Sequence, residues 1–421
     1  MSSEDKMTID ERYKYLRRMQ KRYKKAGRRE RQALLDEMET VTELHRKSLI
    51  RLMRGPIKRK QRKKQRGRVY GIEVDDALRV IWESTDYICA ERLQPNLVWL
   101  AEHLGAHGEL SVTPALLSQL AHISVSTVQR RLTHFRQDQP RLPRKGPREA
   151  NRVRREIPMR RIPWNEQEPG HFEVDLVHHS GEVANGHYVH TLQMVDVLSG
   201  WSERVAVLGR SYLVMADGFR RIESRLPLPI VEIHPDNGSE FLNDHLVRYW
   251  RERFDNVKIS RSRPYRKNDN RFVEQKNQTL VRAYLGSSRF DTVAQTNLLN
   301  QLYDQMWLYY NFFQPVMRLE EKVFSPSDAT RVRHKFDAAQ TPYDRLCAVQ
   351  AIPEARKQQF DKLRQQTNPR QLRRSIYQTI DALFALPCSQ PGQTQDVYLT
   401  LNLPSTILPA SILAGCGHVD S

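Results

Sequence analysis

Apolar residues recur at helical spacing near the start of the chain. Tyr13, Leu16, Met19 and Tyr23 follow one another at steps of three or four residues, which places them on one face of an α-helix. A further apolar set with the same kind of spacing begins at Leu34. We therefore predict that residues 8–54 are helical.

The end of this segment indicates a helix-turn-helix over residues 40–53, in which a short helix and a tight turn precede a helix with a basic face. Arg46, Lys47 and Arg51 lie on that face, and we expect them to contact DNA. An ordinary helical hairpin with a solvated basic face is the alternative, and the pattern alone does not separate the two.

A second helical unit is predicted over residues 73–137, and its segment 116–132 is the better helix-turn-helix candidate. Ser126 is the expected N-cap of the second helix of this segment. That helix presents four polar side chains for which we expect DNA contact: Thr127, Gln129, Arg130 and Arg131. A structural hairpin is again the alternative.

The middle of the chain changes to a strand pattern. Strands are predicted at 171–177, 188–197, 201–208, 230–233 and 257–260. Helices are predicted at 212–226, 241–254 and 269–284. Strands in series, followed by alternating helices and strands, predict a central α/β core with a mixed five-stranded sheet covered by helices.

The remaining patterns complete a multidomain organisation. Residues 296–312 and 343–386 are predicted to be helical, and the proline-rich segment 140–147 marks a boundary. We divide the chain into an all-α helix-turn-helix region (1–56), a basic linker (57–70), a second helical unit (71–140), a linker (141–163), the α/β core (164–330), a helical basic C-terminal region (331–387) and a tail of unassigned role (388–421).

The net charge of the chain indicates the class of its binding partner. The 421 residues carry a formal net charge of +19, and such an excess favours a polyanion because bound phosphates release condensed counterions. An acidic membrane surface is the competing partner, but no stretch of about 18 apolar residues is present, so we expect no membrane association. The four cysteines are far apart, which favours a reducing cytoplasmic setting, here in association with the nucleoid.

The basic residues are densest in the first linker. Eight of the eleven residues from Lys58 to Arg68 are basic, and no apolar periodicity runs through them. Simple solvation is the alternative to DNA contact. We expect contacts with DNA phosphates from Lys58, Arg59, Lys60, Arg62, Lys63 and Lys64.

Three acids in the core form the candidate catalytic and metal-binding set. Asp175 lies within an apolar strand, Asp236 follows a short strand, and Glu274 lies on a predicted helix. Two hard divalent ions held by carboxylates stabilise the attacking and leaving oxygens in phosphodiester chemistry. Taken singly, each acid also has an ordinary structural alternative, as a turn former, an arginine partner or an exposed helix residue. We expect supporting roles around them for Glu173, His179 and Asn237.

The block from about 164 to 330 resembles the integrase core that bacterial insertion-sequence transposases share with retroviral integrases. Four pieces carry the resemblance in order: Asp175 in its strand, Val195-Asp-Val-Leu-Ser-Gly-Trp201, Asp236-Asn-Gly-Ser-Glu-Phe241, and the run from Arg263-Pro-Tyr to Glu274. The resemblance implies an RNase H-like fold and a DDE triad of Asp175, Asp236 and Glu274. It also implies two Mg²⁺ or Mn²⁺ ions, hydrolysis at the donor ends, and strand transfer by the freed 3′-hydroxyl.

The chain departs from the family in two places near Glu274. Thirty-seven residues separate Asp236 from Glu274, rather than the commoner 35, and Val281 stands where many relatives have a basic residue. The zinc-binding domain of retroviral integrases is also absent. We expect the core to contact DNA through Arg263, Lys267, Lys276 and Arg282.

These patterns predict a transposase that binds the terminal inverted repeats of a mobile element as a homo-oligomer and joins their double-stranded DNA to a target. Two alternatives stay open. One is a DNA-binding regulator that keeps an inactive integrase fold, and the other is a metal-dependent nuclease that cleaves without joining.

Overall fold

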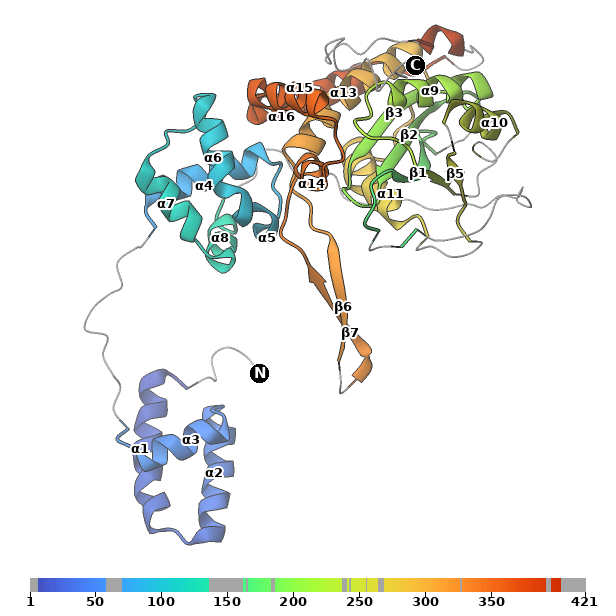
Figure 1. Cartoon of the computed structure of the whole chain (residues 1–421). Helices are drawn as coiled ribbons and strands as arrows, with labels where there is room; N and C mark the ends of the chain where they lie inside the picture. The colour runs from blue at the N-terminus through green and yellow to red at the C-terminus, as the bar shows by residue number, and fades with distance from the viewer. Residues whose placement is uncertain are drawn as a thin grey trace. The chain divides into compact units, whose positions relative to one another are not determined.

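The chain forms two compact units, Met1–Val69 and Tyr70–Ser421. Each unit is described by itself below (Figure 1). The computed structural model describes residues 7–57, 70–135, 162–163, 166–182, 186–236, 241, 244–254, 256–263, 269–325, 328–390 and 395–402.

The first unit is helical, as predicted. It contains α1 (Ile9–Lys25), α2 (Arg28–Thr42) and α3 (Arg46–Arg54). Thr8 caps α1 through a capping box with Glu11, in which each side chain bonds the other residue's backbone N–H. The apolar faces of the three helices enclose one small core, formed by Leu16, Met19, Leu34, Leu35, Met38, Leu49 and Met53 together with Ala26 and Ile57.

The second unit begins with a helical block, which is also predicted. Its elements are α4 (Ile72–Ser84), α5 (Ala90–Leu93), the 3₁₀ turn η2 (Gln94–Asn96), α6 (Leu97–Ala106), α7 (Pro114–His122) and α8 (Val125–Leu132). The prediction that Ser126 caps α8 is wrong. Ser124 is the cap, and its hydroxyl accepts a 3.3 Å hydrogen bond from the backbone N–H of Thr127. Helix α8 therefore begins at Val125, two residues before the start that a cap at Ser126 implies.

A mixed five-stranded sheet follows, as predicted, and confirms the α/β core. Its strands are β1 (His171–His178), β2 (Val189–Asp196), β3 (Ser202–Leu208), β4 (Glu232–Pro235) and β5 (Lys258–Ile259). The order across the sheet is β3-β2-β1-β4-β5. β1 pairs antiparallel with β2 and parallel with β4. β1 is therefore the central strand, between the antiparallel and the parallel part.

The rest of this unit is mainly helical, and several of its helices pack on the sheet (Figure 1). Its helices and helical turns are α9 (Tyr212–Glu223), α10 (Asp244–Arg253), α11 (Arg271–Lys276), the π-helical turn Asn277–Arg282, α12 (Ala283–Leu285), α13 (Val293–Phe312), α14 (Pro342–Ala348), α15 (Glu354–Gln366), α16 (Pro369–Ala385) and the 3₁₀ turn η4 (Val397–Thr400). Helices α9 and α13 both contact β3, and α11 contacts β1 and β2. The candidate third acid therefore lies on a helix that covers the central strand.

A two-stranded hairpin was not predicted. Strands β6 (Leu319–Ser325) and β7 (Asp328–Phe336) pair antiparallel and form a sheet of their own, separate from the five-stranded sheet. Figure 1 shows the pair in orange. The expected boundary between residues 330 and 331 falls inside β7, so it cuts through a hydrogen-bonded element.

Asp86 connects the helical block to the rest of the second unit. Its buried carboxylate accepts hydrogen bonds from Arg373 Nε (3.2 Å) and Tyr377 OH (2.8 Å) on α16, and from Tyr284 OH. Nearby, Tyr309 OH on α13 donates a 2.7 Å hydrogen bond to the carbonyl of Ser84. These bonds hold the end of α4 against α13 and α16. In the described part of the chain, no helix has the length and apolar character needed to cross a membrane.

Candidate active site

The two candidate aspartates lie on neighbouring strands at the same level of the sheet. β1 and β4 are parallel, and the last residues paired between them are Val174 and Pro235. Asp175 and Asp236 are the next residue along each strand, and both side chains are half-buried. The sheet topology therefore brings together two acids that are 61 positions apart in the sequence.

Asp175 makes two hydrogen bonds that fix its carboxylate. Oδ1 accepts from the backbone N–H of Leu176 at 2.8 Å. Oδ2 accepts from the side-chain amide of Asn277 at 2.7 Å. Asn277 is the first residue of the π-helical turn that continues α11, so this second bond ties the helix to the strand.

Glu173 ties the other end of the same helix to β1. Its buried carboxylate accepts hydrogen bonds from the backbone N–H groups of Phe272 (2.7 Å) and Val273 (3.0 Å) in the first turn of α11. Burial raises the pKa of Glu173 to about 8, against the opposing effect of the two backbone bonds. Glu173 therefore positions α11 against β1, and this is the form of the supporting role that we expect for it.

Glu274 lies between these two attachments and is exposed. It precedes Asn277 by three residues, and residues at that spacing lie on one side of a helix. Since Asn277 bonds Asp175, Glu274 is carried on the side of α11 that faces Asp175. Its charge also contributes to the raised pKa of Glu173, which indicates that the two carboxylates are close.

The donor chemistry of these residues fits a hard divalent cation, because carboxylate and amide oxygens are its preferred ligands. One structural observation agrees with this: Asn277 Oδ1 is buried beside Asp175 and has no hydrogen-bond partner. The arrangement is not a complete metal centre, however. Within the described ranges, no group of three or more His, Cys, Asp or Glu side chains is placed to hold a metal ion.

His179 has a core environment. Its Nε2 atom and Thr191 Oγ1 are 2.8 Å apart, and its ring packs against Phe290. Burial lowers the pKa of His179 well below its ordinary value, so the ring is neutral. The expected supporting residue Asn237 lies outside the described residues, as do Lys58, Arg59, Lys60, Arg62, Lys63, Lys64 and Lys267.

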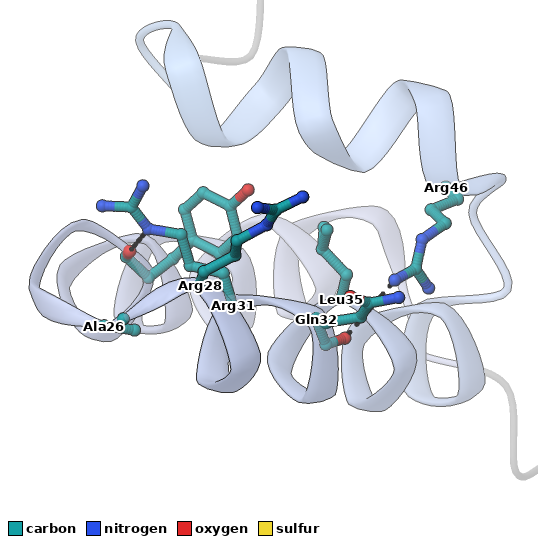
Figure 2. A pocket seen from close by; sticks show the side chains of 8 residues that line it. Ala26, Arg28, Arg31, Gln32, Leu35 and Arg46 are labelled. Atoms are coloured by element: carbon teal, nitrogen blue, oxygen red, sulfur yellow. Dashed lines mark hydrogen bonds between the residues drawn. The ribbon is translucent and has the colours of Figure 1, made fainter.

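Two of the three basic residues that we expect to contact DNA from the first unit are exposed. Lys47 and Arg51 on α3 are exposed. Arg46 instead forms ion pairs within the unit, with Asp36 and with Glu39. It also lines a hollow of about 660 Å³ together with Arg28, Arg31 and Tyr23 (Figure 2).

In the second helix-turn-helix candidate, too, some of the residues expected to contact DNA are exposed and others are bonded within the protein. Gln129 and Arg130 on α8 are exposed. Thr127 is half-buried, and its hydroxyl accepts a 3.2 Å hydrogen bond from Arg130. Arg131 pairs with Asp75 on α4 and donates a 2.9 Å hydrogen bond to the carbonyl of Tyr70. Its guanidinium therefore holds the helical block together.

The basic residues expected in the core are also engaged with the protein. Arg263 forms a bidentate pair with Asp269, through two 2.8 Å hydrogen bonds that lower the pKa of Asp269. Arg282 donates to the carbonyl of His178 at 2.8 Å. Lys276 is half-buried. Burial lowers its pKa well below the ordinary value, and the charges of nearby arginines lower it further.

Asn277 is the residue that sequence reasoning missed at this site. Its position three residues after Glu274 was available as a signal, because that spacing repeats one face of a helix. Its partner Asp175 lies 102 positions away in the sequence. The local spacing could have placed Asn277 on the helix face of Glu274, but it could not have given the contact with Asp175.

Comparison with models of known protein families gives no match. A curated relative, described as uncharacterized protein y4rM of Sinorhizobium fredii, is 36% identical over 302 residues, which cover 72% of this chain and 86% of the relative. The chain therefore belongs to the same protein family as y4rM.

Proposed function

We propose that the chain is a DDE-type transposase, which cleaves the ends of a mobile DNA element and joins them to target DNA. The observation that carries the proposal is the placement of Asp175 and Asp236 as successive residues beyond the last paired position of two parallel strands. Glu274 is carried on the helix that is hydrogen-bonded to the same strand on both sides of it.

The sheet supports an RNase H-like core. Three antiparallel strands in sequence order are followed by two strands parallel to β1, in the order β3-β2-β1-β4-β5. This is the order that the integrase resemblance implies. The helix pairs α2–α3 and α7–α8 support helix-turn-helix modules, because exposed polar side chains lie on the second helix of each.

The chemistry consists of two displacements at phosphorus. Water first attacks a phosphodiester at the donor end and releases a 3′-hydroxyl. That hydroxyl then attacks a target phosphodiester, so a new bond forms as the target strand breaks. Mg²⁺ or Mn²⁺ held by Asp175, Asp236 and Glu274 would supply charge stabilisation at the attacking and leaving oxygens. Glu173 and Asn277 orient the helix and the carboxylate that this requires.

A joining assay tests the proposal. The DNA that flanks the gene is first searched for inverted repeats, and these ends are then supplied as duplexes with a pre-cut 3′-hydroxyl. Joined product from the wild-type chain supports a transposase, whereas cleavage without joining would identify a nuclease. Because strand transfer brings two ends together, the active form is proposed to be a homo-oligomer on DNA.

A DNA-binding regulator with an inactive core is the second candidate. The observation in its favour is the exposed position of Glu274, together with the lack of a three-residue metal-binding group among the described residues. Metal-independent binding to its own flanking DNA, with neither cleavage nor joining, would select this alternative.

A further inference from the structure

The hairpin β6–β7 stands apart from the five-stranded sheet. Its two strands form a sheet of their own, and no third strand pairs with them among the described residues. Figure 1 shows the pair extending away from the helices that pack on the five-stranded sheet. A lone two-stranded hairpin is marginally stable in water, so strands of 7 and 9 residues favour a ribbon that a partner covers.

The base of the hairpin is fixed to the core. Arg318, the residue before β6, donates from its guanidinium to the carbonyls of Asp196 and Leu198 at the turn between β2 and β3, both at 3.1 Å. Asp337, the residue after β7, accepts from the backbone N–H of Arg318 at 2.7 Å and from Arg345 Nη2 on α14 at 3.1 Å. These bonds join both ends of the hairpin to the core, so they set the direction in which it leaves.

This base lies beside the helix that carries Glu274. The Arg318 guanidinium is 4.5 Å from the centroid of the Phe272 ring on α11. Phe272 precedes Glu274 by two residues, and its backbone N–H bonds Glu173 on the central strand at 2.7 Å. The hairpin therefore leaves the core next to the candidate active site.

Strand β7 carries a row of basic residues. Arg331, Arg333 and Lys335 occupy every second position of the strand, and alternate residues of a strand share one face. Successive members of the row are about 6.7 Å apart along the strand. Lys335 is exposed, and its 2.9 Å ion pair with the exposed Glu320 is of the weak surface kind that phosphates can replace. The row therefore presents three cations to a polyanion.

The opposite face of the hairpin is less suited to a second protein chain. Its paired positions are Leu319–Phe336, Lys322–His334 and Phe324–Val332. A polar pair thus interrupts the apolar positions, whereas the cores of protein–protein interfaces are depleted of charged residues. A two-stranded ribbon also fits the major groove of DNA. DNA is therefore the partner that the pattern favours.

We propose that the β6–β7 hairpin is a DNA-binding arm, and that Arg331, Arg333 and Lys335 contact backbone phosphates of the duplex that enters the site of Asp175. That this duplex is a substrate rests on the proposed function, whereas the binding of a duplex to the arm does not. Because the base of the arm is fixed beside α11, a duplex held by the arm runs close to the candidate catalytic carboxylates.

The test uses the full-length chain and a short duplex of arbitrary sequence, with binding measured over a range of salt concentrations. Arg331→Gln and Arg333→Gln are each expected to weaken binding several-fold and to reduce the slope of log affinity against log salt by about 1. The double variant should reduce the slope by about 2. Arg374→Gln, which removes an exposed arginine on α16, should change neither value. Equal affinity and slope for the double variant and the wild type would overturn the proposal.

A conservative variant separates the charge of the row from the structure of the hairpin. Replacing Arg331 and Arg333 together by lysine keeps both charges, so affinity should stay near that of the wild type and the salt slope should be unchanged. If the lysine double variant loses binding as the glutamine double variant does, the charges are not the cause and the phosphate contacts are refuted.

Sedimentation of the chain without DNA tests the rival partner, a second copy of this chain. Phe336→Ser, at an exposed position of the opposite face, should leave the assembly state unchanged. A smaller assembly for Phe336→Ser, together with normal duplex binding by the glutamine double variant, would assign the hairpin to a second copy and refute the DNA arm. Because binding is measured rather than joining, an arm that binds DNA in a chain that joins no ends would refute the transposase alone.

Discussion

Asn277 and Asp175 are joined by a 2.7 Å hydrogen bond from the side-chain amide Nδ2 to the carboxylate oxygen Oδ2. The bond links the end of α11 to the central strand, and it orients one oxygen of the proposed catalytic carboxylate. The other side of the amide, Oδ1, is buried without a partner.

Substituting Asn277 should therefore affect chemistry more than binding. Hydrogen bonds to charged groups contribute about 1.5–3 kcal/mol, so Asn277→Ala is expected to lower the joining rate by tenfold or more. Duplex affinity should stay within about twofold. Gln278→Ala removes the amide of the exposed neighbouring residue and serves as the matched control. A joining rate equal to that of this control would show that Asn277 has no positioning role.

The raised pKa of Glu173 predicts that the folding stability of the chain depends on pH. Its pKa is about 8 in the folded chain and about 4.5 when unfolded, so the unfolded state binds fewer protons between these values. Stability should consequently fall as pH rises from about 5 to 8, by a few kcal/mol in all, and level off above pH 8.

Glu173→Gln keeps an acceptor for the two backbone N–H groups but cannot ionise. Chemical denaturation of this variant should give stability that is flat over the same pH window, while Glu168→Gln, an exposed carboxylate, follows the wild type. If the wild type itself shows no decline between pH 5 and 8, Glu173 is ionised in the fold and the interpretation is wrong.

Asp86 is expected to be the residue on which the docking of the helical block depends most. Asp86→Ala leaves the buried Arg373 without its carboxylate partner, and breaking such a pair costs about 3–5 kcal/mol. The thermal midpoint of the full chain should drop markedly. Asp76→Ala, at an exposed position of α4, is the control and should have little effect. Equal midpoints for the two variants would contradict the assigned role.

The second helix-turn-helix candidate gives a prediction that separates binding from stability. Arg130→Ala should weaken duplex binding roughly tenfold without changing stability, since Arg130 is exposed. Arg131→Ala should destabilise the chain by about 1–2 kcal/mol, because it removes the partner of Asp75. Comparing affinity and thermal midpoint for both variants checks this, and a destabilised Arg130→Ala would reverse the assignment.

Hydrophobic periodicity was sufficient to predict the helices and the five-stranded sheet. Leu16 and Met19, at a spacing of three, are buried in the first unit, and each of the five predicted strands overlaps an observed strand. The β6–β7 hairpin escaped prediction because it pairs only with itself, so no core face imposes an alternating pattern on its residues.

Pairings between distant residues were not readable from the sequence. Arg131 has the appearance of a DNA-binding residue, yet its partner Asp75 lies 56 positions away. The same holds for Asn277 and for Arg263, whose side chains are directed by tertiary contacts. Residue type and spacing therefore located the candidate acids, while their supporting bonds required the fold.

The joining of pre-cut element ends by Asp236→Asn is the sharpest test of the proposed DDE chemistry. Asp236 follows the strand that is parallel to β1, and its carboxylate is one of the three proposed to hold the metal ions. We expect Asp236→Asn to bind DNA as well as the wild type and to join at least a hundredfold more slowly, whereas Asp381→Asn on the exposed side of α16 should join normally. Undiminished joining by Asp236→Asn would rule out a catalytic role for this carboxylate.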